Sequence, residues 1–368
     1  MKKRIFLPLL CLLLSLCPFS FLHVNAADIS AKAGVVISAD TGNTVYEKNA
    51  SARLPMASTT KIMTALVALE KSSPDEVVTV APEAAGIEGS SIYLFAGEKI
   101  KMDTLLYALL LESANDAAAA IAIHIAGSIE AFADMMNEKA AELGLTDTHF
   151  TNPHGLYDES HYTSAYDLAK LAVKALENEK FREIVSTYKK SVPMEAGGAA
   201  RLFVNHNKLL RTYEGAIGVK TGYTKKSGRC LVSAAERDGI RFVAVTLSAP
   251  DDWRDHAAML DLAFASYERT LLARSKELSF TLPVIGGELP FVQCTNTDEA
   301  YAIVKKGGKN VTCKIELPRF LFAEIKKGDA LGSAIFYNNG KQVAKVPLTA
   351  SFDVPRVTYK KGFFGIFG

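Results

Sequence analysis

The sequence predicts an α+β protein: an antiparallel sheet with helices packed on it, followed by a small all-β domain. Three observations predict this class. Short β-runs lie at both ends of residues 27–272 and enclose a helix-rich middle. Local hairpin signals join these runs, and no repeated βαβ unit is present, which favours antiparallel pairing. Beyond about Lys276, short β-runs alternate with glycine- and asparagine-containing turns, a spacing typical of a small β-domain.

The length and composition of the chain are those of a globular protein. It has 368 residues, of which 49% are apolar and 22% charged, enough to bury a sizeable core in about two domains. The 42 basic and 40 acidic residues give a formal net charge of +2. This balance excludes a strongly basic nucleic-acid-binding protein, and we expect no nucleic-acid partner.

The first 26 residues have the layout of a secretory signal peptide. Lys2, Lys3 and Arg4 precede an apolar run over 5–16, and the small-residue site Val24-Asn25-Ala26 follows. An uncleaved membrane anchor is the alternative, but a spanning helix needs about 20 apolar residues. Cleavage after Ala26 leaves 39 basic and 40 acidic residues, a net charge of −1. We therefore expect an exported protein.

The elements of the expected fold each have a local signal. Two β-runs flank an Asp/Gly/Asn loop and predict a hairpin over 34–46. An alanine-rich, helix-forming stretch covers 58–177, interrupted by proline and glycine. Strand patterns return later in the chain, at 218–221, 230–236 and 240–248. The strong hairpin signal Asp238-Gly239 lies between the last two of these strands. A helix around Met259–Phe264 closes the region.

Three cysteines remain after removal of the leader: Cys230, Cys294 and Cys313. Three thiols allow at most one disulfide within the chain. Cys294 and Cys313 are the candidate pair because both lie in the β-rich segment, and unpaired thiols are the alternative. The sequence has no C-x-x-C or H-E-x-x-H spacing, so we expect neither a metal nor another cofactor.

A serine and a lysine one helical turn apart are the first candidates for chemistry. Ser58-Thr59-Thr60-Lys61 opens a helix whose following residues are almost all apolar. Positions three apart meet on one helix face, so Lys61 can reach Ser58. Burial can lower a lysine pKa by as much as about 3–5 units, so a neutral amine that activates the hydroxyl is feasible. Ser186-Thr187-Tyr188-Lys189 has the same spacing without the apolar context, so the pattern alone is weak.

Two further motifs strengthen this interpretation. Ser113-Ala114-Asn115 lies in a break between two helical runs, where a plain helix cap is the alternative. Lys220-Thr221-Gly222 lies on an expected strand, where an edge lysine before a turn is the alternative. The ordered set S-x-x-K, S-x-N and K-T-G is typical of β-lactamases and penicillin-binding proteins.

The sequence resembles the low-molecular-mass penicillin-binding proteins, specifically the serine-type D-alanyl-D-alanine carboxypeptidases. The blocks that carry the resemblance extend beyond the three motifs, at 54–61, 112–116, 151–156 and 218–224. The resemblance implies a β-lactamase/penicillin-binding-like catalytic domain with an inserted helical subdomain. We expect a signal peptide at 1–26, a catalytic domain at 27–272, a β-rich domain at 276–357 and a tail at 358–368.

The resemblance also implies roles for individual residues. Ser58 would be the acylated nucleophile, Lys61 its general base, and Ser113 the group that passes a proton to the leaving amine. The remaining residues would bind substrate. Asn115 would hydrogen-bond the peptide, and Lys220 and Thr221 would bind the terminal carboxylate. Gly222 would allow the backbone of the ligand to approach closely. Tyr223 would share the oxyanion hole with Ser58 through backbone N–H groups. Arg254 is the candidate for an additional carboxylate ligand, with Arg241 the alternative, and we expect His154 to fix a loop.

The implied reaction is removal of the last D-alanine from a peptidoglycan stem peptide that ends in D-Ala-D-Ala, with β-lactams acylating Ser58 in the same way. The alternatives are a class A β-lactamase and a non-catalytic wall-binding protein. A class A β-lactamase carries an E-x-x-L-N motif, and the nearest stretch here is Glu142-Leu143-Gly144-Leu145-Thr146, which ends in threonine in place of asparagine. We expect export across a bacterial cytoplasmic membrane and a secreted, wall-associated or membrane-surface location. The terminal 360–368, with two lysines and four large apolar residues, predicts at most weak peripheral membrane contact, and a frayed tail is the alternative.

Overall fold

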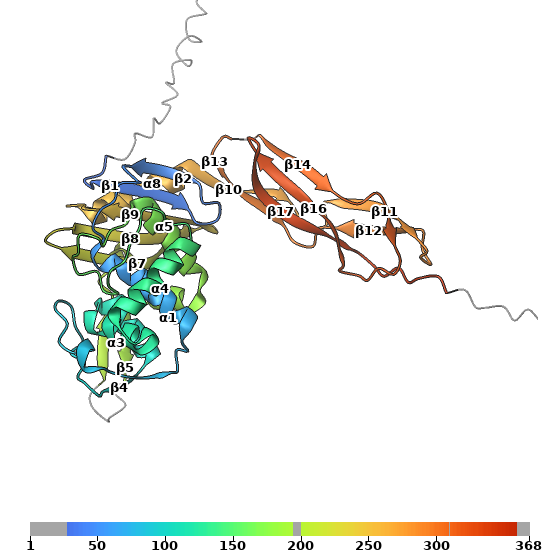
Figure 1. The fold of residues 1–368 in the computed structure, drawn as a ribbon. Helices are drawn as coiled ribbons and strands as arrows, with labels where there is room; N and C mark the ends of the chain where they lie inside the picture. The colour runs from blue at the N-terminus through green and yellow to red at the C-terminus, as the bar shows by residue number, and fades with distance from the viewer. Residues whose placement is uncertain (1–27, 194–199, 309, 359–368) are drawn as a thin grey trace, which may run out of the picture.

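The computed structural model describes residues 28–193, 200–308 and 310–358. The expected signal peptide at 1–26 and residues 359–368 of the expected tail lie outside the described residues. The first and larger part is built on a five-stranded antiparallel sheet (Figure 1). Its strand order is β2-β1-β9-β8-β7, formed by β1 (Ala33–Ser38), β2 (Thr44–Lys48), β7 (Ala216–Thr224), β8 (Gly228–Arg237) and β9 (Ile240–Leu247). The hairpin expected at 34–46 and the later strand patterns are therefore confirmed.

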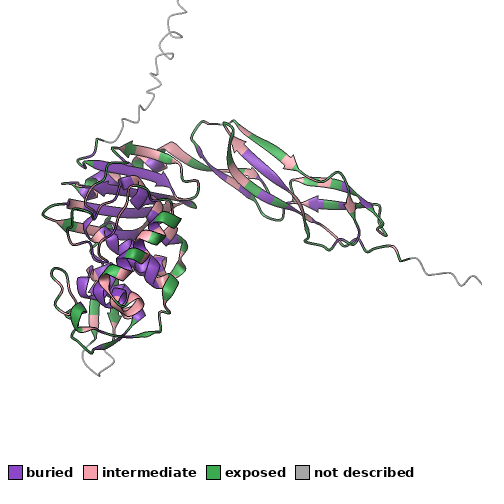
Figure 2. Cartoon of the chain, viewed as in Figure 1, coloured by how far each residue is buried: buried purple, intermediate pink, exposed green. Residues whose placement is uncertain are grey.

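Both faces of this sheet are buried by helices, as the alternating side chains of its strands require. Val35 of β1 faces the core formed with α1 (Lys61–Lys71) and α5 (Ala165–Glu177). Val36, one residue on, faces the core formed with α8 (Asp252–Ser266), the helix expected around Met259–Phe264. The strands at the centre of the sheet are accordingly buried along their length (Figure 2).

A helical region lies between β2 and β7 in the sequence and packs beside the sheet (Figure 1). Alanines line α3, where their small side chains allow close helix packing around the fully buried residues 117–120. The region consists of η1 (Ala57–Thr60), α1, β3 (Val77–Thr79), η2 (Pro82–Ala84), β4 (Lys99–Lys101), α2 (Met102–Tyr107), η3 (Ala108–Glu112), α3 (Asn115–Ala126), α4 (Ile129–Glu142), α5, α6 (Glu179–Ser186), β5 (Lys189–Val192), β6 (Arg201–Val204) and α7 (Leu209–Thr212). It matches the helix-rich middle that the sequence predicts.

The C-terminal part is an all-β unit that projects to one side of the first part (Figure 1). Its main sheet has the order β14-β16-β17-β12-β11-β15, from β11 (Ser279–Ile285), β12 (Phe291–Thr295), β14 (Val311–Glu316), β15 (Leu321–Phe322), β16 (Ala330–Asn338) and β17 (Lys341–Ala350). A two-stranded antiparallel ladder of β10 (Tyr267–Ala273) and β13 (Ala300–Lys305) joins the two parts. The expected small β-domain is thus present.

The three described cysteines form no disulfide. Cys294 lies on β12 and Cys313 on β14, with β16 and β17 between these strands in the sheet. Neighbouring strands are about 4.8 Å apart, and the two residues also pair with different positions along β17, so they are separated by more than about 14 Å, which is beyond disulfide reach. Cys230, Cys294 and Cys313 are therefore free thiols, as in the second of the two expectations.

No single helix among the described residues is long and apolar enough to cross a bilayer. The helices α3 and α4 meet the length and hydropathy criteria only when they are counted together, and the pair is bent by 84°.

Candidate active site

The buried amine of Lys61 is the centre of the site. Ser58 lies in η1 and Lys61 begins α1, so one helical turn brings the two side chains together. Lys61 Nζ is 3.0 Å from Ser58 Oγ, 2.6 Å from Asn115 Oδ1 and 2.7 Å from the carbonyl oxygen of His154. The Lys61 side chain is fully buried, whereas Ser58 is partly open to solvent. The amine therefore has a fixed set of three partners.

These partners fix the direction of the amine lone pair. The His154 carbonyl can only accept a hydrogen bond, and Asn115 presents its oxygen to Lys61 because its Nδ2 donates to the Glu88 carbonyl at 2.6 Å. A neutral amine has two N–H groups, and these two acceptors use both. The lone pair is then left facing Ser58 Oγ, so the amine can accept the hydroxyl proton.

The environment favours this neutral form. Burial, reinforced by the nearby positive charge of Lys220, holds the pKa of the Lys61 amine well below its ordinary value. The carboxylate of Asp116 acts in the opposite direction. Asp116 is itself engaged by the backbone N–H groups of Ile92 and Leu94 and by the Ser91 hydroxyl. Its charge is therefore spread over several donors, and desolvation of Lys61 dominates.

Ser113 reaches the site from a strained break between helices. η3 is a π-helical turn, and Ser113 directly after it adopts a left-handed backbone with φ 62° and ψ 30°. Such a conformation is uncommon for a residue other than glycine and is found at functional sites. It directs the buried Ser113 into the same cavity as Ser58. Asn115 begins α3 and points inward, where both ends of its amide are already bonded.

The strand β7 forms the opposite wall and lies at the edge of the sheet. Lys220 is fully buried on it and donates to the Thr221 carbonyl at 3.0 Å, while Thr221 and Tyr223 line the cavity. A Cβ atom at Gly222 would lie 3.0 Å from the backbone nitrogen of Ser58. Only glycine allows this approach, which brings the backbone of β7 against the N-terminal turn that carries Ser58.

The cavity between these walls has a volume of about 390 Å³. Its lining is rich in polar and cationic side chains, and the residues are Ser58, Ser90, Ser113, His206, Lys208, Thr221, Gly222, Tyr223, Arg229, Asp252 and Trp253. A small polar cavity with converging donors suits an anionic peptide end.

Arg229 lines the cavity, whereas Arg254 and Arg241, the two expected candidates, do not. Arg229 follows the β7–β8 turn, pairs with Tyr223 in the sheet and is held by Asp252 at 2.7 Å. The Arg254 side chain is 82% exposed and does not line the cavity, since it lies on the outer side of the first turn of α8. Arg241, the alternative, is paired with Glu236 at 2.6 Å away from the cavity. Arg229 could be recognised as a cavity residue from its pairing with Tyr223 across the β7–β8 hairpin. That pairing can be used only once the register of the two strands is known.

The turn that carries Ser58 is held from behind by His161. The backbone N–H of Thr151 donates to His161 Nδ1 at 3.0 Å, so Nε2 carries the proton and donates to Thr60 Oγ1 at 2.7 Å. Thr60 Oγ1 in turn donates to the Ala57 carbonyl at 2.8 Å. Burial lowers the pKa of His161 to about 4, which keeps the ring neutral. Gly155 completes the support, because a Cβ there would lie 2.0 Å from the Ala57 oxygen.

His154 fixes the adjacent loop, as expected. Its ring Nδ1 accepts from the Leu156 backbone N–H at 3.2 Å, and its carbonyl binds Lys61. His154 thus contributes a backbone oxygen to the site. A sequence motif is defined by side chains, so it does not predict this contact.

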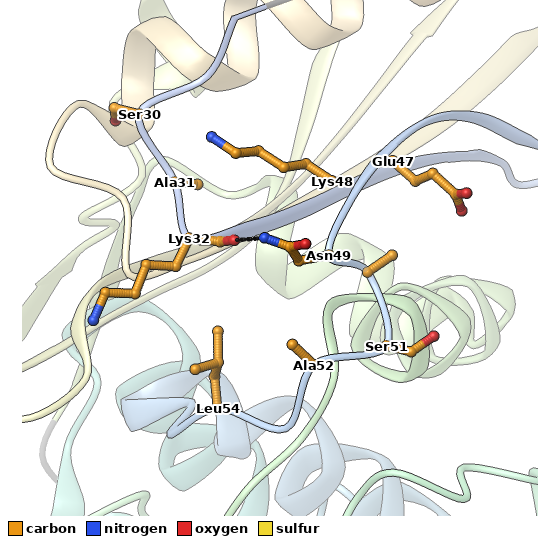
Figure 3. Close-up of a pocket in the computed structure, with 10 residues that line it drawn as sticks. Ser30, Ala31, Lys32, Glu47, Lys48, Asn49, Ser51, Ala52 and Leu54 are labelled. Atoms are coloured by element: carbon orange, nitrogen blue, oxygen red, sulfur yellow. Dashed lines mark hydrogen bonds between the residues drawn. The ribbon is translucent and has the colours of Figure 1, made fainter.

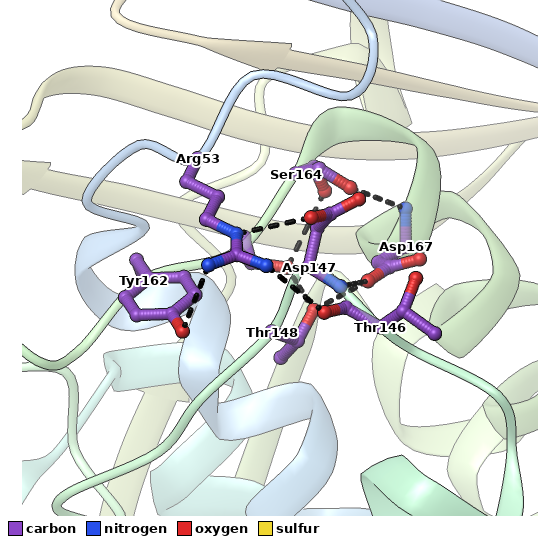
Figure 4. Close-up of polar contacts among 8 residues, drawn as sticks. Arg53, Thr146, Asp147, Thr148, Tyr162, Ser164 and Asp167 are labelled. Carbon is purple, nitrogen blue, oxygen red and sulfur yellow. Dashed lines mark hydrogen bonds and ion pairs between the residues drawn. The ribbon is translucent and has the colours of Figure 1, made fainter.

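A polar network anchors the segment that leads into Ser58 (Figure 4). Arg53 donates to Asp147 Oδ1 at 3.0 Å, and the next residue, Leu54, pairs with Thr163 through two backbone hydrogen bonds. Asp167, near the start of α5, accepts from the Asp147 backbone at 2.7 Å and from the Thr148 hydroxyl at 3.0 Å. These bonds tie the entering chain to the 146–148 loop and to α5, so Ser58 is placed by a fixed scaffold.

A larger, open hollow of about 950 Å³ lies elsewhere on the sheet edge, lined by residues such as Lys32, Lys48 and Leu54 (Figure 3). Asn49 there donates to the Lys32 carbonyl at 2.9 Å, and Lys48 donates to the Ile29 carbonyl at 2.7 Å. Its polar groups serve the fold, and the Ser30 hydroxyl there donates to the Asp255 carboxylate at 2.8 Å, which also accepts the Ser30 backbone N–H. Within the described ranges, no group of three or more His, Cys, Asp or Glu residues is placed to hold a metal ion.

Comparison with known proteins agrees with this geometry. Residues 21–251 match the family model described as D-alanyl-D-alanine carboxypeptidase. The chain belongs to the D-alanyl-D-alanine carboxypeptidase family. Residues 267–356 of this carboxypeptidase match the model of the penicillin-binding protein 5 C-terminal domain, which agrees with the all-β unit described above.

Two relatives cover most of this carboxypeptidase, and a third covers about two thirds of it. The D-alanyl-D-alanine carboxypeptidase DacF of Bacillus subtilis is 34% identical, over 96% of this chain and 95% of its own. The crystal structure of penicillin-binding protein 5 from Haemophilus influenzae is 26% identical, with a TM-score of 0.68 over 89% of this chain and 98% of its own. The Streptomyces K15 DD-transpeptidase is 34% identical, with a TM-score of 0.61, over 64% of this chain and 98% of its own. The family and fold that the sequence predicts are confirmed.

Proposed function

We propose that this protein is a serine D,D-carboxypeptidase that removes the terminal D-alanine from peptidoglycan stem peptides through an acyl-enzyme on Ser58. The observation that carries the proposal is the neutral Lys61 amine with its lone pair facing Ser58 Oγ. Membership of the D-alanyl-D-alanine carboxypeptidase family gives the activity its substrate class.

The acylation step follows from the placement of these groups. Ser58 Oγ attacks the carbonyl carbon of the penultimate D-alanine while its proton passes to Lys61 Nζ. The negative charge that develops on the carbonyl oxygen is stabilised by the backbone N–H groups of Ser58 and Tyr223, which the close approach at Gly222 brings together. Ser113 passes a proton to the leaving amine and takes in exchange the proton that Lys61 holds, so D-alanine departs as the C–N bond breaks and Lys61 is again neutral.

Deacylation reverses the roles with water. Lys61 takes a proton from a water molecule that attacks the Ser58 ester, and Ser58 Oγ leaves with that proton. The shortened stem peptide is then released. The same groups would transfer the acyl chain to an amine of another peptide, and the Streptomyces K15 relative is named a DD-transpeptidase. We propose water as the acceptor because the relatives that span this whole chain are named carboxypeptidases.

The substrate carboxylate binds at the cationic end of the cavity. Lys220 supplies buried positive charge, Thr221 offers a hydroxyl, and Arg229 adds a guanidinium that Asp252 holds in place. An arginine fork matches the geometry of a carboxylate. We therefore assign to Arg229 the function expected of Arg254.

β-Lactams are proposed to acylate Ser58, because their strained amide and carboxylate occupy the positions of the peptide and its C-terminus. Rapid turnover of a β-lactam would require a further carboxylate beside the ester. Glu142, in the stretch that approaches the E-x-x-L-N motif, is exposed at the end of α4 and bonds Lys139 at 2.6 Å. It does not line the cavity, which favours a long-lived acyl-enzyme.

The test is release of D-alanine from a peptide ending in D-Ala-D-Ala, together with labelling by a fluorescent penicillin. We expect both in the wild type and neither in Ser58→Ala. Ser186→Ala is the matched control, because Ser186 and Lys189 have the same spacing but lie on α6 and β5 outside the cavity. D-alanine release by Ser58→Ala would overturn the assignment of the nucleophile, and an unlabelled wild type would favour the non-catalytic wall-binding alternative.

We also propose that the protein is exported by the leader at 1–26 and works at the outer face of the membrane, with a catalytic domain at 27–272 and a β-rich domain at 276–357. Peripheral membrane contact is supported at the free end of the β-rich domain. Large apolar side chains are exposed there: Ile285, Leu289, Phe291, Phe320 and Phe322. The backbone N–H of Val357 donates to the Gly286 carbonyl at 2.9 Å at this same end, so the last described residues lie beside these side chains. Equal partitioning of the processed protein with and without residues 360–368 would contradict a tail contribution.

A further inference from the structure

Trp253 contacts two cations at the substrate cavity. It is the single tryptophan of the chain, lies in the first turn of α8 and lines the cavity. Arg229 Cζ is 5.7 Å from the centre of its ring, and Lys208 Nζ is 6.0 Å from it. Both are at cation–π distance, at which the face of an indole ring attracts a positive charge. Arg229 has a role in the proposed reaction, whereas Lys208 has none so far.

The segment that leads into α7 presents Lys208 to the cavity. Side chains at 205–209 alternate between buried and exposed, and the exposed ones, His206 and Lys208, line the cavity. Asn205 fixes this segment, because its Nδ2 donates to two backbone carbonyls at the end of α6, at 3.1 and 3.2 Å. Its Oδ1 accepts the Asn207 backbone N–H at 2.9 Å. Lys208 therefore reaches the cavity from a backbone that is held in place.

Lys208 also carries a positive charge that no carboxylate offsets. The other basic side chains in the cavity lining each face an acid, since Arg229 is 2.7 Å from Asp252 and His206 is 3.4 Å from Glu112. Among the described residues, no carboxylate oxygen lies within 4.0 Å of Lys208 Nζ. An anion that enters the cavity therefore meets the Lys208 ammonium as a charge that is not already neutralised.

We propose that Lys208 is a further substrate-binding residue, which binds the terminal carboxylate of the peptide beside Arg229, with Trp253 as the positioning residue for both cations. This inference rests on the proposed carboxypeptidase function. Asp252 already offsets the charge of Arg229, so a second, unpaired cation adds net attraction for an anion. Because both cations contact one indole ring, a carboxylate bound to Arg229 lies within reach of the flexible lysine stem.

The decisive comparison removes the charge of Lys208 and keeps its packing. Lys208→Met leaves an unbranched apolar side chain over the Trp253 ring, and Lys208→Arg keeps the charge. We expect KM for the D-Ala-D-Ala peptide to rise roughly fivefold in Lys208→Met with kcat within about twofold of the wild type, and Lys208→Arg to keep both within about twofold. Lys208→Gln also removes the charge, so the test does not depend on the folding of one variant.

The charge of the substrate is tested through the fluorescence of Trp253. In Ser58→Ala, titration with the D-Ala-D-Ala peptide, and with the same peptide ending in a carboxamide, gives a Kd for each, because the single tryptophan lies at the cavity. Addition of Lys208→Met should weaken binding of the acid peptide roughly fivefold and leave the Kd of the carboxamide within about twofold. The difference for the acid peptide should shrink at about 1 M salt, where exposed charges are screened.

Lys226→Met is the matched control. Lys226 is likewise an exposed lysine over an aromatic ring, 5.7 Å from the centre of Tyr157, but it does not line the cavity. Its KM should equal that of the wild type, and thermal melts identify any variant that fails to fold.

Two results overturn the inference. One is a KM within about twofold of the wild type in both Lys208→Met and Lys208→Gln. The other is an equal weakening of the acid and carboxamide peptides, which would show that packing on Trp253 and not charge matters. Both leave D-alanine release by the wild type intact. Absence of release and of penicillin labelling in the wild type would instead refute the proposed function itself.

Discussion

Replacement of Gly222 by alanine tests whether the close approach of β7 to the Ser58 turn builds the oxyanion site. An added Cβ would lie 3.0 Å from the Ser58 nitrogen and 3.1 Å from both the Thr59 nitrogen and the Ala57 Cβ. All three atoms belong to the backbone or to a short side chain, so none can swing away. Because ordinary contacts begin at 3.4 Å, the strand and the turn must separate by a few tenths of an ångström.

That separation should cost activity more than stability. Among the described strands β7 pairs with β8 alone and lies at the edge of the sheet, so it can move outward without breaking a second strand pairing. The movement misaligns the Ser58 and Tyr223 N–H groups, and loss of one such donor costs about 10²–10³ in rate. We expect partial misalignment to lower the acylation rate constant by roughly 10–100-fold, about 1.4–2.7 kcal/mol of transition-state stabilisation.

The assay is the rate of acylation by a fluorescent penicillin, with D-alanine release and a thermal melt beside it. Gly308→Ala is the control, because a Cβ there would be equally close to backbone, 3.0 Å from the Lys305 oxygen, but in the β-rich domain. Its acylation rate should equal that of the wild type. A Gly222→Ala rate within about twofold of the wild type, with an unchanged melting temperature, would refute the reasoning.

Three further outcomes are expected. Lys220→Met removes the cation that helps to depress the pKa of Lys61, so the acid limb of acylation should move to higher pH; an unmoved limb would contradict this coupling. Arg229→Gln should raise KM for the D-Ala-D-Ala peptide about tenfold and Arg254→Gln should leave it unchanged, and the reverse result would restore Arg254 as the carboxylate ligand. Burial lowers the pKa of His256 to about 3, whereas the unfolded value is about 6.5, so protons bind the unfolded chain first and stability falls as pH decreases through this window. Melting temperatures between about pH 6.5 and 4 should fall less steeply in His256→Gln than in the wild type, and parallel slopes would contradict this.

The parts of the site that follow local rules could be predicted from the sequence. Residues three apart on a helix meet, so the Ser58–Lys61 pair needs no knowledge of the rest of the fold. The hairpin signal Asp238-Gly239 and the alternating patterns around it likewise locate β8 and β9. Recognition of the family motifs then joined segments that are more than 150 residues apart.

The parts that depend on strand register or on the backbone could not be predicted. Arg229 reaches the cavity because it pairs with Tyr223, and a shift of one residue would turn it to the other face. Lys61 is bound by the His154 carbonyl, and every residue has such a group. Asn115, expected to bind the peptide, has both ends of its amide engaged inside the protein. Motif spacing gives a residue's neighbourhood but not its partners.

The β10–β13 ladder has a mechanical consequence. Six residue pairs connect these strands, and the chain that leaves β10 returns through β13. Ile303 of β13 also packs into the core beneath α8, so the ladder is held to the first part by side-chain packing as well as by backbone pairing. A single proteolytic nick in the β12–β13 loop would therefore leave the halves attached. The ladder therefore connects the two parts as a paired two-stranded element and not as a flexible linker. It holds Ser58 at a fixed distance from the far end of the β-rich domain.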